Sequence, residues 1–206
     1  MNLKIILSIA ILLLIGIVFV SAWAAETYVS VEKGWNLLYG FMTPDQLDGQ
    51  LLEKANIKAV YAFIPTTQKY AQLYPNREIN SFSTIDDDEV SQMGMFVYSD
   101  KAERTEYWLD NMPAQLNEIN LYSGWNFVGI TQNFAGKSIN QIKGNCNIQK
   151  AYAFEEGNWV SLENNMDDTR MLGENLVQFH GIVLKVSANC KLGTPTGEVP
   201  SVPNLP

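Results

Sequence analysis

Length, composition and charge set the first bounds on this chain. It has 206 residues, 47% of them hydrophobic, and its 14 basic and 22 acidic side chains give a formal net charge of -8. That apolar content is enough to bury a core, so a chain disordered throughout is excluded. The negative charge repels phosphate backbones and anionic head groups, which argues against a nucleic-acid partner and limits membrane contact to the N-terminal segment.

The N-terminus carries an export signal. Lys4 precedes an uncharged run, residues 5–20, dominated by Ile, Leu and Val, as in the n-region and h-region of a signal peptide. Ala22 and Ala24 put small residues at the positions that a signal peptidase reads, which predicts removal of residues 1–24. The alternative is a retained membrane anchor, because residues 5–25 are just long enough to span a bilayer as a helix. Both alternatives place the remaining chain outside the cell, secreted or at the cell surface.

Three short motifs occur twice in the same order. Gly34-Trp35-Asn36 recurs as Gly124-Trp125-Asn126, residues 58–63 recur as 149–154, and residues 93–97 recur as 180–184, with offsets of 90, 91 and 87. Collinear matches of this kind indicate an internal duplication. We therefore expect two tandem homologous modules, residues 27–112 and 117–193, followed by a Pro-rich extended tail at 194–206. The short linker between them, residues 110–117, predicts a fixed interface.

Each copy is expected to open with a strand that contains the Gly-Trp-Asn motif. In the first copy a period of two assigns the following apolar residues to one face: Val29, Val31, Trp35, Leu37, Tyr39 and Phe41. In the motif, Gly permits a bend, Trp buries a large side chain, and Asn bonds a neighbouring backbone group. The motif is therefore predicted to be structural.

A short helix and further strands follow in each copy. Residues 43–46 resemble an N-cap with a proline at the first helical position, and the corresponding helix of the second copy spans 138–143. Residues 59–64 and 151–154 are apolar on both faces, as central strands are. Hairpins come next, with a tighter turn in the second copy, and the third motif supplies another buried strand. The predicted fold class is α+β, predominantly β, each module being a small antiparallel sheet with one short helix.

The two cysteines, Cys146 and Cys190, lie in the second module. In an oxidising compartment an isolated pair most simply forms one disulfide, which here closes a loop of 44 residues. Chain-entropy reasoning gives such a bond about 4 kcal/mol. Two free thiols or half a metal site are the competing interpretations. They have little support, because His180 is the only histidine and the sequence has no Cys-x-x-Cys spacing.

This order of motifs resembles the Gly-Trp-Asn modules of bacterial and archaeal extracellular proteins. The second copy is the more similar, because residues 181–190 look like the closing strand of such modules, whose cysteine pairs with one just after the helix, here Cys146. The first copy lacks both cysteines. The resemblance covers about residues 28–193 and implies surface display, but no particular activity.

Acidic residues gather in corresponding stretches of the two copies, at Asp86, Asp87, Asp88, Asp167 and Asp168. Clustered oxygen ligands in an extracellular loop are suited to Ca²⁺. Ser91, however, stands where a calcium loop counted from Asp86 has glycine. The alternative is a solvated acidic loop, and no other cofactor is predicted.

The sequence lacks the usual signatures of catalysis. His180 corresponds to Met93 in the first copy, which favours packing over chemistry, and no Gly-x-Ser-x-Gly elbow occurs. Gly136-Lys137-Ser138 resembles the end of a phosphate loop, but Thr131 stands where that motif needs glycine. A pair of glycosidase carboxylates is compatible with the composition, yet modules of this size offer no deep cleft. We predict that the chain is not an enzyme.

Aromatic residues near the predicted hairpins are the remaining binding candidates. Trp159, Trp108 and Tyr70 could stack on sugar faces if exposed, or could cap the small cores. The sequence thus predicts an exported, non-enzymatic, cell-surface or secreted pair of modules with an envelope, adhesive or scaffolding role. The alternative is an extracellular carbohydrate-binding protein that uses these aromatics, with or without calcium. In both cases the expected partner is an extracellular protein or a glycan.

Overall fold

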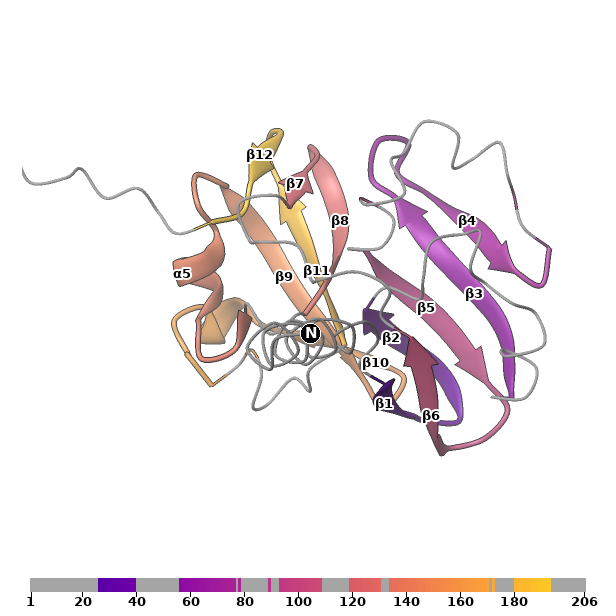
Figure 1. The fold of residues 1–206 in the computed structure, drawn as a ribbon. Helices are drawn as coiled ribbons and strands as arrows, with labels where there is room; N and C mark the ends of the chain where they lie inside the picture. The colour runs from indigo at the N-terminus through magenta and orange to yellow at the C-terminus, as the bar shows by residue number, and fades with distance from the viewer. Residues whose placement is uncertain are drawn as a thin grey trace, which may run out of the picture.

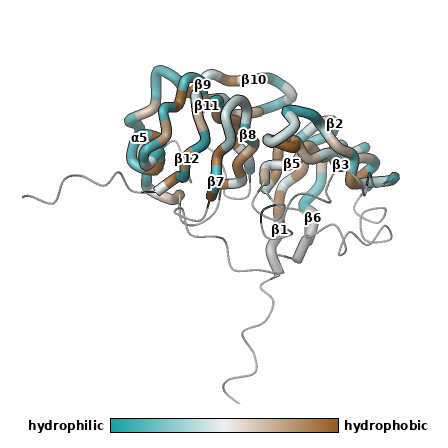
Figure 2. Tube along the Cα trace, turned by 90° about the horizontal axis from the view of Figure 1, so that it is seen from above, coloured by the Kyte–Doolittle hydropathy of each residue, from teal (hydrophilic) through white to brown (hydrophobic). Residues whose placement is uncertain are grey.

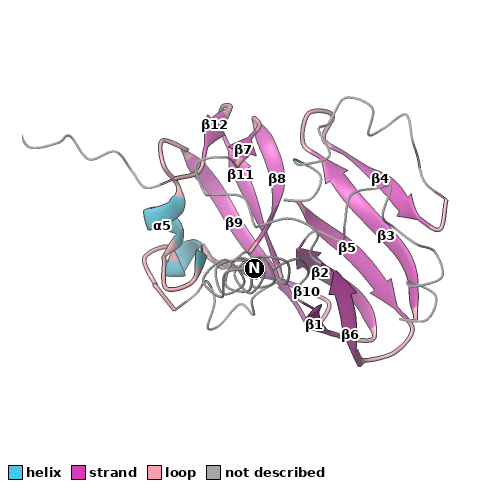
Figure 3. Cartoon of the chain, in the orientation of Figure 1, coloured by secondary structure: helices cyan, strands magenta, loops and turns pink. Residues whose placement is uncertain are grey.

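The computed structural model describes residues 26–39, 56–76, 78, 89, 93–108, 119–130, 134–170, 172 and 180–193. The predicted export segment, first helix, inter-module linker and Pro-rich tail lie outside these residues. Strands dominate the described chain (Figure 3), and the α-helix is the short α5 (Ile139–Ile142). Within the described ranges, no helix is long and apolar enough to cross a membrane.

Two four-stranded antiparallel sheets form the framework. The first contains β2 (Gly34–Tyr39), β5 (Gly94–Ser99), β3 (Ile57–Ile64) and β4 (Lys69–Tyr74), in that spatial order. The second contains β8 (Gly124–Gly129), β11 (Gly181–Val186), β9 (Ile148–Glu155) and β10 (Asn158–Ser161), again in spatial order. Each repeated motif therefore occupies the same place in its own sheet, and β3 and β9 are internal strands as predicted. The sheets lie side by side, with α5 at the end farthest from the first sheet (Figure 1).

The expected long first strand is broken in both copies. β1 (Glu26–Val31) leaves the first sheet and pairs with β6 (Glu103–Trp108), and β7 (Asn120–Leu121) pairs with β12 (Cys190–Lys191). The break is a turn closed by the motif asparagine. Asn36 accepts a hydrogen bond from the Glu32 N–H at 2.8 Å and donates to the Glu32 carbonyl at 2.8 Å. Asn126 bonds Tyr122 in the same way, at 2.7 Å in both directions.

The motif glycines and asparagines thus act as predicted, but the expected burial of the motif tryptophan was wrong. Gly34 and Gly124 have φ of 106° and 103°, a region that favours glycine. Trp35, in contrast, leaves 41% of its side chain exposed. The turn shifts the alternation by one residue, so Leu38 joins Val29 in the core and Trp35 points to the opposite face.

Each sheet covers its own hydrophobic core on one face. The first core gathers residues of β1, β2, β3 and β5, among them Val29, Leu38 and Met95. In the second core Ile139 and Ile142 of α5 are fully buried. A capping box starts this helix, because Ser138 accepts from the Gln141 N–H at 3.2 Å and the Gln141 side chain accepts from the Ser138 N–H at 2.9 Å. The predicted helix at 138–143 is confirmed.

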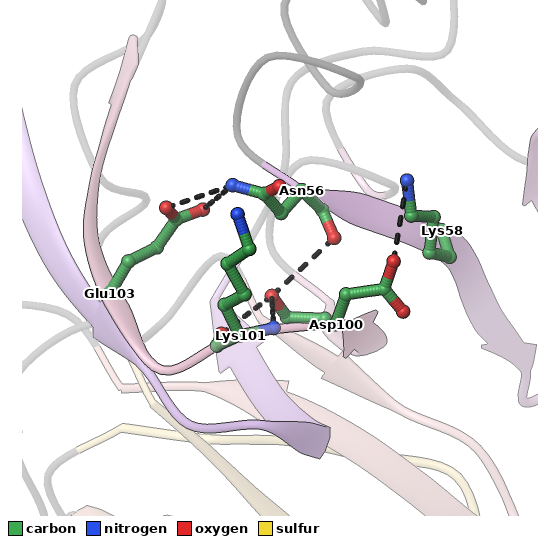
Figure 4. A network of polar contacts seen from close by, with 6 residues as sticks. Asn56, Lys58, Asp100, Lys101 and Glu103 are labelled. Carbon is green, nitrogen blue, oxygen red and sulfur yellow. Dashed lines mark hydrogen bonds and ion pairs between the residues drawn. The ribbon is translucent and has the colours of Figure 1, made fainter.

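Corresponding corners of the two modules are joined by different chemistry. In the second, Cys146 and Cys190 form the predicted disulfide, with Cα atoms 5.3 Å apart. In the first, the Asn56 amide donates to both carboxylate oxygens of Glu103, at 3.1 and 3.0 Å (Figure 4). Both links connect the start of the internal strand with the last strand of the module. A polar contact therefore stands in the first module where the second has a covalent bond.

The two sheets also contact each other through corresponding backbone positions. Leu38 forms an isolated bridge with His180, and Val128 forms one with Met93. Small residues allow this approach, because a side chain on Gly129 would overlap the ring of Tyr39. In Figure 2 hydrophobic stretches of β5 and β8 lie where the sheets adjoin.

Candidate binding surface

A third hydrophobic cluster lies on the sheet faces that point away from the two cores. Its buried members are Leu37 and Phe63 from the first sheet and Phe127 and Val183 from the second. Among the described aromatic residues, Phe127 and Phe63 are the closest ring pair, with centroids 4.7 Å apart. This cluster joins the two sheets through side chains.

Around the buried cluster, ring contacts form one connected network, which we call the aromatic face. Its members are Trp35, Tyr61, Phe63, Tyr70, Phe96, Tyr98, Trp125, Phe127, Tyr152, Phe154 and Trp159. Phe96 bridges the modules, with its centroid 5.2 Å from Phe154 and 5.8 Å from Trp159. Tyr70 and Trp159 remain 49% and 46% exposed. The aromatic face is thus buried at its centre and open to solvent at its edges.

Strand alternation explains why the sequence places these rings together. On β3, Val60 and Ala62 enter the core while Tyr61 and Phe63 point to the opposite face, and Ala151 and Ala153 alternate with Tyr152 and Phe154 on β9 in the same way. The apolar character of both strand faces, which predicted central strands, therefore has a second cause. One face packs on the module core and the other contributes to the aromatic face.

Two hollows open on the aromatic face. The larger has a volume of about 460 Å³ and is lined by Phe63, Tyr70, Trp125, Phe127, Tyr152, Trp159 and Val183. The smaller, of about 380 Å³, is lined by Trp35, Tyr61, Tyr70, Phe96 and Phe154. Trp35 and Tyr61 correspond to Trp125 and Tyr152 under the sequence repeat, and Tyr70 borders both hollows. Each module thus contributes the same motif tryptophan and strand tyrosine to its own hollow.

Polar groups at the edge of the larger hollow fix its shape. Gln68 accepts from the Trp125 N–H at 2.8 Å and donates to the Trp125 carbonyl at 3.0 Å, as a neighbouring strand would. The Lys185 ammonium lies 5.6 Å from the Trp125 ring centroid, within cation–π range. Lys150 forms an exposed ion pair with Glu163 at 2.9 Å. The Lys185 cation therefore lies beside one of the rings that line this hollow.

Several polar ring atoms of the aromatic face make no hydrogen bond within the described part of the chain. They include the indole N–H groups of Trp35 and Trp159 and the hydroxyl of Tyr70. Partial burial raises the pKa of Tyr70, so its hydroxyl stays protonated and able to donate at neutral pH. The surface offers donors beside apolar ring faces.

Two of the three predicted aromatic candidates lie on this surface. Trp159 and Tyr70 line the larger hollow, whereas the side chain of Trp108 lies outside the described residues. The sequence motif predicted only a structural role for Trp35 and Trp125, whereas both line hollows of the aromatic face. The turn before each motif shifts by one residue which strand side chains face the core. Recognising that turn in the sequence would have placed both tryptophans on the opposite face.

The acidic candidates do not meet at one described site. Asp86, Asp87 and Asp88 lie outside the described residues. Asp167 accepts from the Asn140 amide at 2.8 Å, and hydrogen bonds from Arg170 lower the pKa of Asp168. Among the residues that the structure describes, no group of three or more His, Cys, Asp or Glu side chains could hold a metal ion.

His180 lies at the contact between the sheets, where its carbonyl accepts from the Ile130 N–H at 2.7 Å. Burial lowers the pKa of its imidazole below the ordinary value of 6.5. The unfolded chain therefore binds a proton first, so stability is unaffected above about pH 6.5 and is lost as the pH falls below it. We expect His180→Met, which installs the first-module residue, to reduce the loss of stability between about pH 7 and 5. Urea unfolding at several pH values checks this, and parallel pH profiles for both proteins would contradict it.

Comparison of the chain with protein-family models, with curated proteins and with solved structures finds no match.

Proposed function

We propose that this is an exported, non-enzymatic protein of two modules that acts at the cell surface or after secretion, in an envelope, adhesive or scaffolding role. The apolar N-terminus, the disulfide and the resemblance to Gly-Trp-Asn modules support this proposal. The aromatic face is its binding surface for an extracellular partner.

The observation that carries the proposal is the partial exposure of large rings over two adjoining hollows. Trp35, Tyr70 and Trp159 are between 41% and 49% exposed, although burying a side chain of this size would gain roughly 2 kcal/mol or more. Contiguous exposed apolar surface in a soluble protein marks interaction sites. Aromatic residues at the centre of such a surface contribute most to binding.

A glycan is the second candidate partner, and the half-exposed rings beside free N–H and hydroxyl groups favour it. A sugar ring would stack on an indole face while its hydroxyls accept from the ring edges. In this alternative the acidic stretches, residues 86–88 and 167–168, are the candidate calcium ligands.

Binding to envelopes prepared from the native host tests the proposal. We expect Trp159→Ala to weaken binding of the labelled protein about tenfold or more, because the ring contributes to both the surface and its hollow. Val160→Ala is the matched control, since Val160 is the next residue of β10, is 38% exposed and does not line either hollow. Equal binding by Trp159→Ala and the unchanged protein, both folded by near-UV circular dichroism, would remove the aromatic face from the proposal.

A glycan array separates the two candidate partners. Glycan binding that is lost on Trp159→Ala with the fold intact would support the carbohydrate alternative. Absence of binding to every glycan on the array would count against it. The intact mass of protein from the native host, before and after reduction, tests export in parallel. Loss of residues 1–24 and thiols that react only after reduction are the expected results.

A further inference from the structure

The lining of the smaller hollow restricts the class of ligand that the aromatic face takes. Its five residues are all aromatic, and none is charged or carries an amide. Sugar hydroxyls both donate and accept hydrogen bonds, so a buried sugar needs carboxylate or amide partners to satisfy them. This lining supplies apolar ring faces, one indole N–H and two tyrosine hydroxyls, and it has no carboxylate or amide group.

A polyproline II segment has the complementary chemistry. It has three residues per turn and no internal hydrogen bonds, so its carbonyls are free to accept from N–H and hydroxyl groups. Proline-rich segments bind in grooves lined by aromatic residues, because their conformation is preformed and little entropy is lost. Within the described residues the ring donors of Trp35, Tyr70 and Trp159 make no hydrogen bond, so they are suited to such carbonyls.

The sequence of this chain contains a proline-rich segment, residues 194–206. Prolines stand at positions 200, 203 and 206 of the tail, the three-residue spacing that a polyproline II helix brings to one side. The only charged residue of the tail is Glu198, two positions before the first of these prolines. Lys185 beside Trp125 gives the larger hollow a charge of opposite sign.

The place where the tail begins points to a neighbouring molecule. Gly193 donates to the Ile142 carbonyl at 2.8 Å and accepts from the Gly144 N–H at 2.9 Å. These contacts hold it beside α5, which packs on the core face of the second sheet, opposite the aromatic face. The tail therefore starts on the side of the sheet away from the molecule's own hollows, while those of another copy are open to it.

Building on the proposed function, we propose that the aromatic face binds the Pro-rich tail, residues 194–206, of a second copy of this chain. Such a contact joins two different surfaces, so it links copies head to tail instead of closing a symmetric dimer. The protein would thereby assemble on the surface where it is displayed.

A mixing experiment with two variants of the whole protein tests this contact. Pro200→Ala/Pro203→Ala damages the tail and keeps the aromatic face, whereas Trp159→Ala damages the face and keeps the tail. In sedimentation velocity we expect the unchanged protein to associate as its concentration rises. Each variant alone should associate at least about tenfold more weakly. Mixed together, the two variants should form a one-to-one complex, because each supplies what the other lacks. Val160→Ala should associate like the unchanged protein.

Several outcomes would overturn the inference. Undiminished association of the tail variant would exclude the tail as ligand, and so would a mixture that remains monomeric while both variants are folded. If Trp159→Ala fails to fold, Trp35→Ala in the smaller hollow takes its place in the same mixture. If envelope or glycan binding needs Trp159 while the tail variant associates undiminished, the tail is rejected as ligand and the proposed function stands. If Trp159→Ala and Trp35→Ala keep both partner binding and self-association, the tail contact and the proposed function are both rejected.

Discussion

Replacing Cys146 and Cys190 together by alanine is expected to lower the free energy of unfolding by about 4 kcal/mol. The bond closes 44 residues, a loop that contains β9, β10 and β11 and hence three of the four strands of the second sheet. Without it the unfolded state regains the entropy of that loop. Urea unfolding under non-reducing conditions, followed by far-UV circular dichroism, measures the loss.

Reduction provides the matched control for this variant. The unchanged protein in reducing buffer should lose about as much stability as the double variant, whereas the variant itself should be insensitive to reductant. The second module should also unfold before the first, whose corresponding corner is held by Asn56 and Glu103. A loss below about 1 kcal/mol would mean that the β7–β12 pairing and the core hold this corner without the bond.

Much of the fold follows from local signals in the sequence. The repeats placed β2, β3 and β5 in correspondence with β8, β9 and β11, and the Ser138 capping box marked α5. The hairpin turn at Glu156 and Gly157, with φ of 48° and 79°, was also indicated by its residues. These features are encoded by a few neighbouring side chains, so sequence patterns reveal them.

The departures have a common physical cause. A period of two continued through Glu32 and Lys33 predicts one strand, but the Asn36 side chain closes a turn there and reverses which face is buried. The β1–β6 pairing joins segments far apart in the chain, and no local pattern specifies it. Because this turn was not predicted, neither the pairing of β1 with β6 nor the outward orientation of Trp35 was predicted.

The candidate surface was only partly predictable for the same reason. Trp159 and Tyr70 were chosen for their place near hairpins, which depends on local turns. The contacts of Tyr70 with Phe127 and of Trp159 with Phe96 depend on how the two sheets pack. That packing in turn needs residues such as Gly129, which leaves room for the ring of Tyr39 from the other module. Sequence patterns identified the strands of each sheet, but not how the faces that point away from the two cores adjoin.

Replacing Phe127 by alanine is expected to cost about 3–5 kcal/mol, the usual range for removing a buried phenylalanine ring. Phe127 is 7% exposed and contacts rings of both modules, with centroid distances of 4.7 Å to Phe63, 5.8 Å to Phe96 and 6.3 Å to Trp159. The loss should therefore weaken the contact between the sheets as well as the second module. Urea unfolding gives the free energy, and amide hydrogen exchange of β5 reports the contact.

Phe134→Ala separates the two effects, because Phe134 is also a buried phenylalanine but belongs only to the core of the second module. Both variants should lose stability of similar size. Only Phe127→Ala should speed exchange at Phe96 and its neighbours on β5, since the Phe127 ring is one of the contacts of that strand with the second module and Phe134 makes none of them. Equal exchange of β5 in the two variants would mean that the sheets are coupled without the Phe127 ring, through the backbone bridges of Leu38 and Val128 and the contacts of Phe96 with Phe154 and Trp159.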